Sequence, residues 1–137
     1  MRYASVDSKT TQALTDAAAQ CRRSMRTAGL EVADKPSLDT VATLEKLISS
    51  YAEKHIPNEQ SVFQFVALLG ETVRGVYGGS WVEADVGRGR ELGVVTDGPY
   101  GDVFWNITGK MRKRLQLGIQ ESLTFYWKAI SEQLRQK

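Results

Sequence analysis

Cysteine and histidine are nearly absent from this chain, which has one residue of each type among its 137 residues. One cysteine cannot form an intrachain disulfide, and one cysteine with one histidine cannot supply the ligands of a zinc site. A thiol nucleophile needs a base within reach, and only Cys21 and His55 could form such a pair. The composition therefore excludes a metal site built from cysteine and histidine. The carboxylates around residues 83–102 follow no calcium-loop spacing, so we expect no metal and no cofactor.

Long apolar runs and a strong net charge are also missing. No stretch approaches the length needed to cross a membrane, and residues Met1 to Thr11 lack the apolar core of a secretory signal. The formal net charge of +2 is too small to predict nucleic-acid binding. With 42% hydrophobic and 25% charged residues, the chain fits a single domain over residues 1–137. We expect a cytoplasmic protein without membrane contact.

The charges that are present are distributed unevenly. Residues 36–104 carry five basic and ten acidic side chains, whereas residues 105–137 carry seven basic and two acidic ones. If the two segments meet in the fold, they form an internal electrostatic contact. If they face solvent, they form two surfaces that select partners. The sequence leaves both alternatives open.

The stretch from Asn58 to Val82 organises the rest of the chain. Its apolar residues recur at steps of three and four, which is the period of a helical face. Asn58 can cap a helix, and Gly78 can end it in the left-handed conformation, which predicts a central helix from about Glu59 to Tyr77. A strand that carries Trp81 is expected to follow.

Two helices are predicted before this central helix. The first covers Ser8 to Ala28 and has a face of small side chains that permits close packing. The second begins after Ser37 or Asp39 and ends before Pro57. Because the link to the central helix is short, we expect the second and third helices to pack as an antiparallel pair.

Two helices are predicted in the C-terminal segment. One runs from Lys110 to Leu117 and ends at Gly118, with Met111 and Leu115 directed inward. The other has an apolar stripe that starts at Ile119 and continues to the end of the chain, so we expect it to dock on the domain. Four basic side chains of the shorter helix are expected to be exposed: Lys110, Arg112, Lys113 and Arg114.

The residues between the central helix and the C-terminal helices have a strand pattern. The runs Ser80–Ala84 and Leu92–Thr96 flank a charged tip at Asp85–Glu91, which predicts a β-hairpin. A turn cluster follows at Asp97–Gly101, and residues 102–107 form either a third strand or the entry to the next helix. The predicted fold class is α+β and mainly helical: four or five helices around the central one, with a small antiparallel hairpin packed on them.

Few side chains suggest chemistry. Cys21 lies on the apolar face of its helix, as a buried core thiol does, and His55 lies at a helix end where its ring can bond the last carbonyls. Glu71 and Arg74 stand three residues apart on the central helix, which predicts a surface ion pair. A buried Glu71 would instead be the best candidate for a catalytic carboxylate.

The second half of the chain resembles a group of small uncharacterised bacterial domains. In that group a helix with a Gly-Glu step leads through a Gly-Gly-x-Trp turn into short strands, a basic helix and a Ser-Leu-x-x-Tyr-like helix. The matching residues here are Leu69-Gly70-Glu71, Gly78-Gly79-Ser80-Trp81, Lys113-Arg114-Leu115, Gly118 and Glu121-Ser122-Leu123-Thr124-Phe125-Tyr126. The resemblance implies a fold and brings no catalytic residue. Proteins that look like this are sometimes immunity proteins that protect a bacterium from a secreted toxin.

These observations predict a non-enzymatic protein-binding domain, and the resemblance implies that it is an immunity protein that occludes its toxin. One alternative is a regulatory or adaptor domain that binds an acidic partner or nucleic acid through the basic residues 110–114. Another is a carboxylate-based enzyme that relies on Glu71 and the carboxylates of the hairpin. No oligomeric state is predicted. The predicted contact residues are Glu83, Asp85, Arg88, Arg90, Glu91, Asp97 and Asp102.

Overall fold

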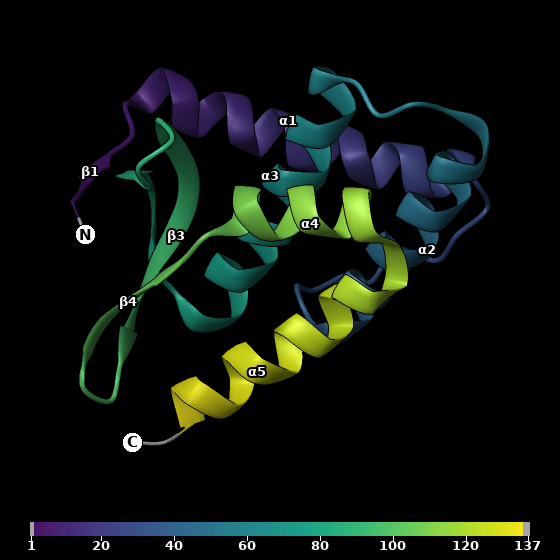
Figure 1. Ribbon diagram of the computed structural model, residues 1–137. Helices are drawn as coiled ribbons and strands as arrows, with labels where there is room; N and C mark the ends of the chain where they lie inside the picture. Colours follow the sequence, from purple (N-terminus) through teal and green to yellow (C-terminus); the bar gives the residue numbers. More distant parts are fainter. Residues whose placement is uncertain (1, 136–137) are drawn as a thin grey trace.

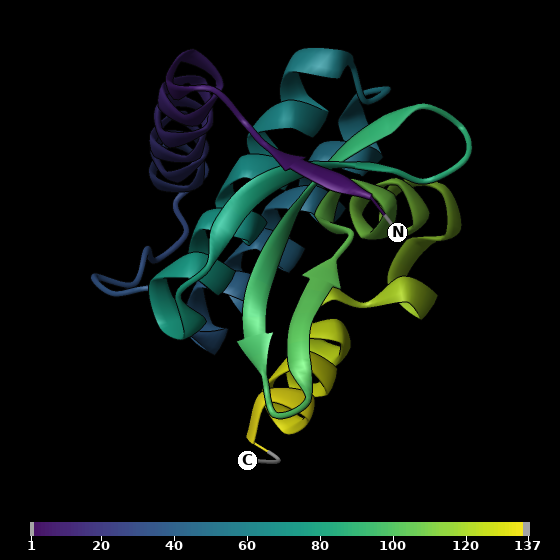
Figure 2. The same ribbon diagram turned by 90° about the vertical axis from the view of Figure 1, so that its left-hand side faces the viewer.

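The structure is a layer of helices packed against one face of a four-stranded antiparallel sheet (Figures 1 and 2). It is a computed structural model that describes residues 2–135. Within these residues the predicted α+β, mainly helical class is confirmed, although the sheet is larger than the predicted hairpin. The elements in chain order are β1 (Tyr3–Ser5), α1 (Ser8–Thr27), α2 (Leu38–Lys54), α3 (Glu59–Tyr77), β2 (Ser80–Asp85), β3 (Arg90–Gly98), β4 (Gly101–Trp105), α4 (Ile107–Leu117), the 3₁₀ turn η1 (Gly118–Glu121) and α5 (Leu123–Arg135).

Helix α3 lies at the centre of the fold and has the bounds that the sequence predicts. The side chain of Asn58 accepts a hydrogen bond from the N–H of Ser61 (2.8 Å), and Gly78 ends the helix with a φ of 76°. Residues 65–70 are all buried, which requires neighbours on several sides of the helix. The predicted neighbour α2 contacts α3 near the C-terminal end of α2, where the ring of Tyr51 packs edge-on against the ring of Phe65. Helix α1 makes a more extensive contact with α3 than α2 does.

The sheet docks on α3 through the indole of Trp81. This ring lies on Gly70, where an added Cβ would stand 2.0 Å from Trp81 Cη2. The close approach explains a glycine in the middle of a helix, where it costs about 1 kcal/mol relative to alanine. Val94 and Trp105 are buried as well, and the indole N–H of Trp105 donates to the hydroxyl of Thr96 (2.8 Å). The expectation that the hairpin packs on a helix is therefore confirmed.

Strand β1 was not predicted from the sequence, because its three residues are exposed and show no apolar alternation. It pairs with β2 and forms one edge of the sheet. The sheet curls so strongly that the ring of Tyr3 stacks on the ring of Phe104 in β4 at 6.3 Å, although two strands lie between β1 and β4. Gly93 lies against the Phe104 ring, since an added Cβ would stand 2.4 Å from it.

Residues 102–107, which the sequence left open, divide between a strand and a helix. Strand β4 ends at Trp105, and the side chain of Asn106 accepts a hydrogen bond from the N–H of Gly109 (2.9 Å) to cap α4. The last helix begins later than predicted, because Ile119 lies in the 3₁₀ turn and is 66% exposed. Helix α5 docks on the domain through its apolar stripe, as predicted. Within residues 2–135 no helix is both long and apolar enough to cross a membrane.

The acidic middle segment and the basic C-terminal segment meet inside the fold at two ion pairs. Arg114 Nε lies 3.0 Å from Glu45 Oε2, and the two side chains are 5% and 10% exposed. The other carboxylate oxygen of Glu45 accepts a hydrogen bond from the N–H of Leu123, the first residue of α5. Arg112 pairs with Glu91 of β3. At these two pairs the charges of the two segments therefore neutralise each other within the fold and do not form two separate surfaces that face solvent.

Candidate functional site

An open groove of about 1030 Å³ lies between the first turns of α3, the β2–β3 hairpin and α4. The groove has an apolar floor to which three elements contribute, and all but one of its floor residues are only half-buried. Within residues 2–135 no further element covers this part of the domain, so the apolar surface stays accessible. The floor consists of Val62, Phe63, Val66, Leu92 and Leu115.

The hairpin supplies a charged rim above this floor, and Figure 2 shows its tip projecting above α4. Glu83 of β2 and Arg90 of β3 form a diagonal pair across the two strands with 4.0 Å between Oε2 and Nη1, and their side chains are 42% and 68% exposed. Such an exposed pair is weak and leaves both groups accessible to a partner. Arg88 at the tip is exposed.

The tip is a closed turn. Gly87 and Gly89 have positive φ angles of 83° and 110°, which favour glycine. The carboxylate of Asp85 accepts a hydrogen bond from the N–H of Gly87 (3.0 Å), and the N–H of Val86 donates to the carbonyl of Gly89 (3.2 Å). Asp85 thus shapes the turn that presents the rim.

Glu91 forms a fixed wall of the groove. Its side chain is 9% exposed and accepts hydrogen bonds from Arg112 and, at 3.5 Å, from Asn106. The hydrogen bond from Arg112 holds the pKa of Glu91 below its ordinary value, although burial acts in the opposite direction. Glu91 is therefore held by its hydrogen bonds to Arg112 and Asn106. It is less available to a partner protein than the sequence predicted.

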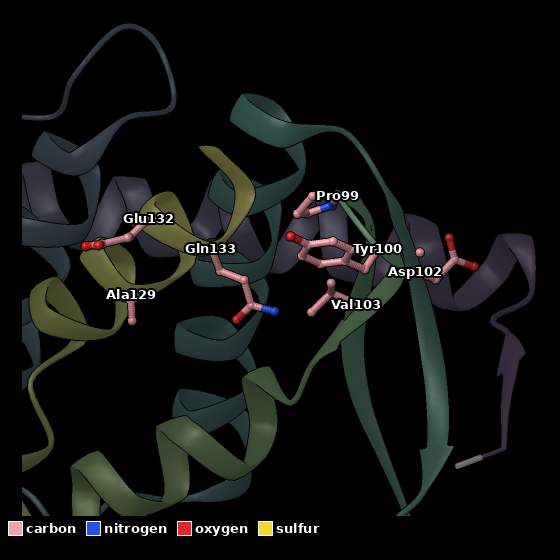
Figure 3. Close-up of a pocket in the computed structure, with 8 residues that line it drawn as sticks. Pro99, Tyr100, Asp102, Val103, Ala129, Glu132 and Gln133 are labelled. Atoms are coloured by element: carbon pink, nitrogen blue, oxygen red, sulfur yellow. The ribbon is translucent and has the colours of Figure 1, made fainter. Parts of the chain in front are cut away.

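The predicted contact residues divide between two ends of the sheet. Glu83, Arg88, Arg90 and Glu91 line the groove, with Asp85 at the turn beside them. The remaining two, Asp97 and Asp102, face each other at the opposite end of β3, next to a second and smaller groove (Figure 3). The floor residues were missed, because on sequence alone the helical ones have the spacing of core positions and Leu92 belongs to an apolar strand run.

The prediction that four basic side chains of α4 are exposed is wrong for two of them, Lys110 and Arg114. Arg114 is 4% exposed, and Lys110 pairs with Glu121 at 2.6 Å. Arg112 is 41% exposed but paired with Glu91, and Lys113 is exposed without an ion pair among residues 2–135. The physical reason is helical geometry: at about 100° per residue, positions 110, 112, 113 and 114 point in different directions.

Cys21 and His55 do not form a catalytic pair. The thiol of Cys21 is fully buried in α1, and burial raises its pKa to about 12, which keeps it protonated. His55 is exposed at the end of α2, where its ring stacks on Tyr51 with 4.8 Å between centroids. The predicted burial of Cys21 is confirmed. His55 lies at the helix end as predicted, but within residues 2–135 its ring is stacked on Tyr51 and not hydrogen-bonded to the last carbonyls.

Glu71 and Arg74 form the predicted ion pair at 2.9 Å, but the pair is not on an open surface. The side chain of Glu71 is 16% exposed. Its second carboxylate oxygen accepts hydrogen bonds from the hydroxyl of Thr15 and the indole N–H of Trp81, both at 3.4 Å. The carboxylate therefore joins α1, α3 and β2, and these contacts account for its burial.

No known protein family, curated protein or solved structure matches this chain. The candidate site therefore rests on geometry. An apolar floor surrounded by charged groups has the arrangement of a protein-binding surface, in which an apolar centre is bordered by a polar rim.

Proposed function

We propose that this chain is a non-enzymatic protein-binding domain that takes up a segment of a partner protein in the groove between α3, the hairpin and α4. We further propose that the partner is a secreted toxin and that the chain is an immunity protein that occludes it. The observation that carries the binding is the apolar floor beneath a projecting charged rim.

The floor supplies the free energy of binding. Phe63, Leu92 and Leu115 are half-buried, so a partner side chain that covers them removes apolar area from water, at about 25 cal/mol per Å². The centre of a binding surface usually provides most of its affinity, and an aromatic or aliphatic anchor from the partner would fit this centre.

The rim supplies selectivity. Arg88, Arg90 and Glu83 present charges of both signs on a hairpin that projects from the domain. Charged groups at the edge of an interface mainly raise the association rate and disfavour wrong partners. An immunity protein must capture its toxin quickly and must not bind other proteins, and a rim of this kind serves both needs.

The identity of the partner as a toxin rests on the resemblance of the second half of the chain to domains that include immunity proteins. The two alternatives have less support. The basic residues expected to bind an acidic partner are mostly held in ion pairs with Glu45, Glu91 and Glu121. The carboxylate expected to catalyse a reaction, Glu71, is held by three hydrogen-bond donors.

The test is a growth assay with any toxin-domain protein that is found to be encoded next to the gene for this chain. Co-expression of the chain should restore growth, and the purified proteins should form a complex. Leu92→Glu places a charge on the floor and should abolish both. Arg88→Glu with Arg90→Glu should slow association and weaken neutralisation.

Lys9→Glu is the matched control, because Lys9 is exposed on α1, away from the groove, and the change also reverses a positive charge. It should neutralise the toxin as the wild type does. Absence of a complex would refute the choice of toxin. A complex that none of the groove variants weakens would refute the groove as the binding surface.

A further inference from the structure

The outer edge of β4 is a strand edge that no other strand within residues 2–135 pairs with. The sheet order is β1-β2-β3-β4, so β4 pairs with β3 on one side only. A strand edge of this kind is a template for another extended chain. β4 thus offers a binding surface that lies at the far end of β3 from the groove and does not depend on it.

The register shows which backbone groups the edge presents. The β3–β4 turn has two residues, Pro99 and Tyr100, between the paired residues Gly98 and Gly101. The closing pair of such a turn exchanges hydrogen bonds, and bonded and non-bonded pairs then alternate. The N–H and C=O groups of Asp102 and Phe104 therefore point outward. In the described part of the chain they make no backbone hydrogen bond outside the sheet.

The side chains at this edge differ between the two faces of the sheet. Figure 3 shows Tyr100 and Val103 on the side of α5, near Gln133, and the carboxylate of Asp102 directed away from α5. On the α5 side a groove of about 600 Å³ accompanies the strand, and Tyr100 is 95% exposed beside it. This side can receive an apolar side chain.

The other face is acidic. Asp97 and Asp102 are directly opposite each other in β3 and β4, an arrangement in which like charges repel. Among residues 2–135 neither carboxylate forms an ion pair, and Asp102 accepts one hydrogen bond, from the hydroxyl of Tyr3 (3.3 Å). A positive charge brought to this face would relieve the repulsion.

We propose that the outer edge of β4 binds an extended segment of a partner protein in which basic side chains alternate with apolar ones. Alternate side chains of an added strand point to opposite faces. The basic ones lie on the face of Asp97 and Asp102, and the apolar ones lie beside Val103 and Tyr100. A second copy of this chain does not suit the edge, because it would add two more carboxylates to the acidic face. This surface is separate from the groove of the proposed function.

The experiment is an NMR titration of the ¹⁵N-labelled full chain at low salt with an end-blocked peptide of alternating lysine and valine. The amides of Asp102 to Trp105 should shift first and in a saturable manner. The double variant Asp97→Asn, Asp102→Asn should weaken binding by about fivefold, as expected for the loss of two charge pairs at an exposed site. Because it removes a repulsion, this variant should remain folded, which its own spectrum checks.

Two peptides serve as controls. Alternating glutamate and valine should not bind, and the lysine peptide N-methylated at every second residue should lose the hydrogen bonds to the edge. The proposal is overturned if no saturable shift occurs, if the glutamate peptide binds equally well, or if the shifts fall on Val62 and Leu92 in the groove. It is also overturned if sedimentation shows a dimer joined through β4.

Discussion

Replacing Glu45 with glutamine tests the contact that joins α2, α4 and α5. Glutamine keeps an oxygen that can accept the hydrogen bond from Leu123, but it removes the charge that faces Arg114. The Arg114 side chain is 5% exposed, so water cannot replace the carboxylate. Breaking a buried pair from one side costs about 3–5 kcal/mol. We expect the lower end, because the hydroxyl of Ser49 still accepts a hydrogen bond from Arg114 at 3.0 Å.

Urea unfolding, followed by the fluorescence of the three tryptophans, measures this loss. With a slope of about 2 kcal/mol per M, a loss of about 3 kcal/mol lowers the unfolding midpoint by about 1.5 M. Combining Glu45→Gln with Arg114→Met removes both charges and keeps much of the buried volume. The double variant should therefore lose only about 1 kcal/mol and be more stable than Glu45→Gln alone.

The matched control is Glu83→Gln, which breaks the exposed pair with Arg90 and should cost less than about 1 kcal/mol. If Glu45→Gln leaves the midpoint unchanged, the buried pair does not hold the helices together. The loss of stability in the double variant can also be compared with the losses caused by Glu45→Gln alone and Arg114→Met alone. If those two losses simply add, the two side chains do not interact, and the reasoning from their geometry is wrong.

Three further predictions concern single contacts. Gly70→Ala should destabilise the protein by about 1–3 kcal/mol in urea unfolding, because the new Cβ meets the Trp81 ring. In a double-mutant cycle Trp81→Phe should reduce this penalty. A Gly70→Ala variant that is more stable than the wild type would contradict the close approach. Cys21 should react with Ellman's reagent only after denaturation, since its thiol is buried with a pKa of about 12; rapid labelling of the native protein would contradict this. Glu91→Gln should lower stability at neutral pH. Because the folded pKa of Glu91 lies below its unfolded value of about 4.3, its contribution is present above that value and is lost as the pH falls further, so the wild type and the variant should converge in acid unfolding.

The helices and turns could be predicted because their signals are local. Asn58 and Gly78 mark the two ends of α3 by capping chemistry, and the apolar period between them sets its core face. The hairpin tip was predicted for the same reason, since Gly87 and Gly89 occur where the chain must turn. Strand β1 could not be predicted, because its partner in β2 lies about eighty positions away and its own residues show no pattern.

The candidate site was predicted only in part. Arg88 and Arg90 follow from the charged hairpin tip, and both line the groove. The floor, for example Phe63 and Leu115, could not be predicted, because helical spacing marks an apolar residue as inward-facing without showing whether a neighbour covers it. Arg114 was misjudged for a related reason: the carboxylate that makes its burial tolerable, Glu45, lies 69 residues earlier in the chain.

The sequence by itself determines the parts of this protein that depend on neighbours along the chain. These are the ends of α3, the turn at the hairpin tip and the buried state of Cys21 in its helix. The tertiary structure alone decides which charges neutralise each other and which apolar residues stay uncovered. Ion pairing and burial depend on distances between residues that are far apart in sequence, and those distances exist only once the helices have packed against the sheet.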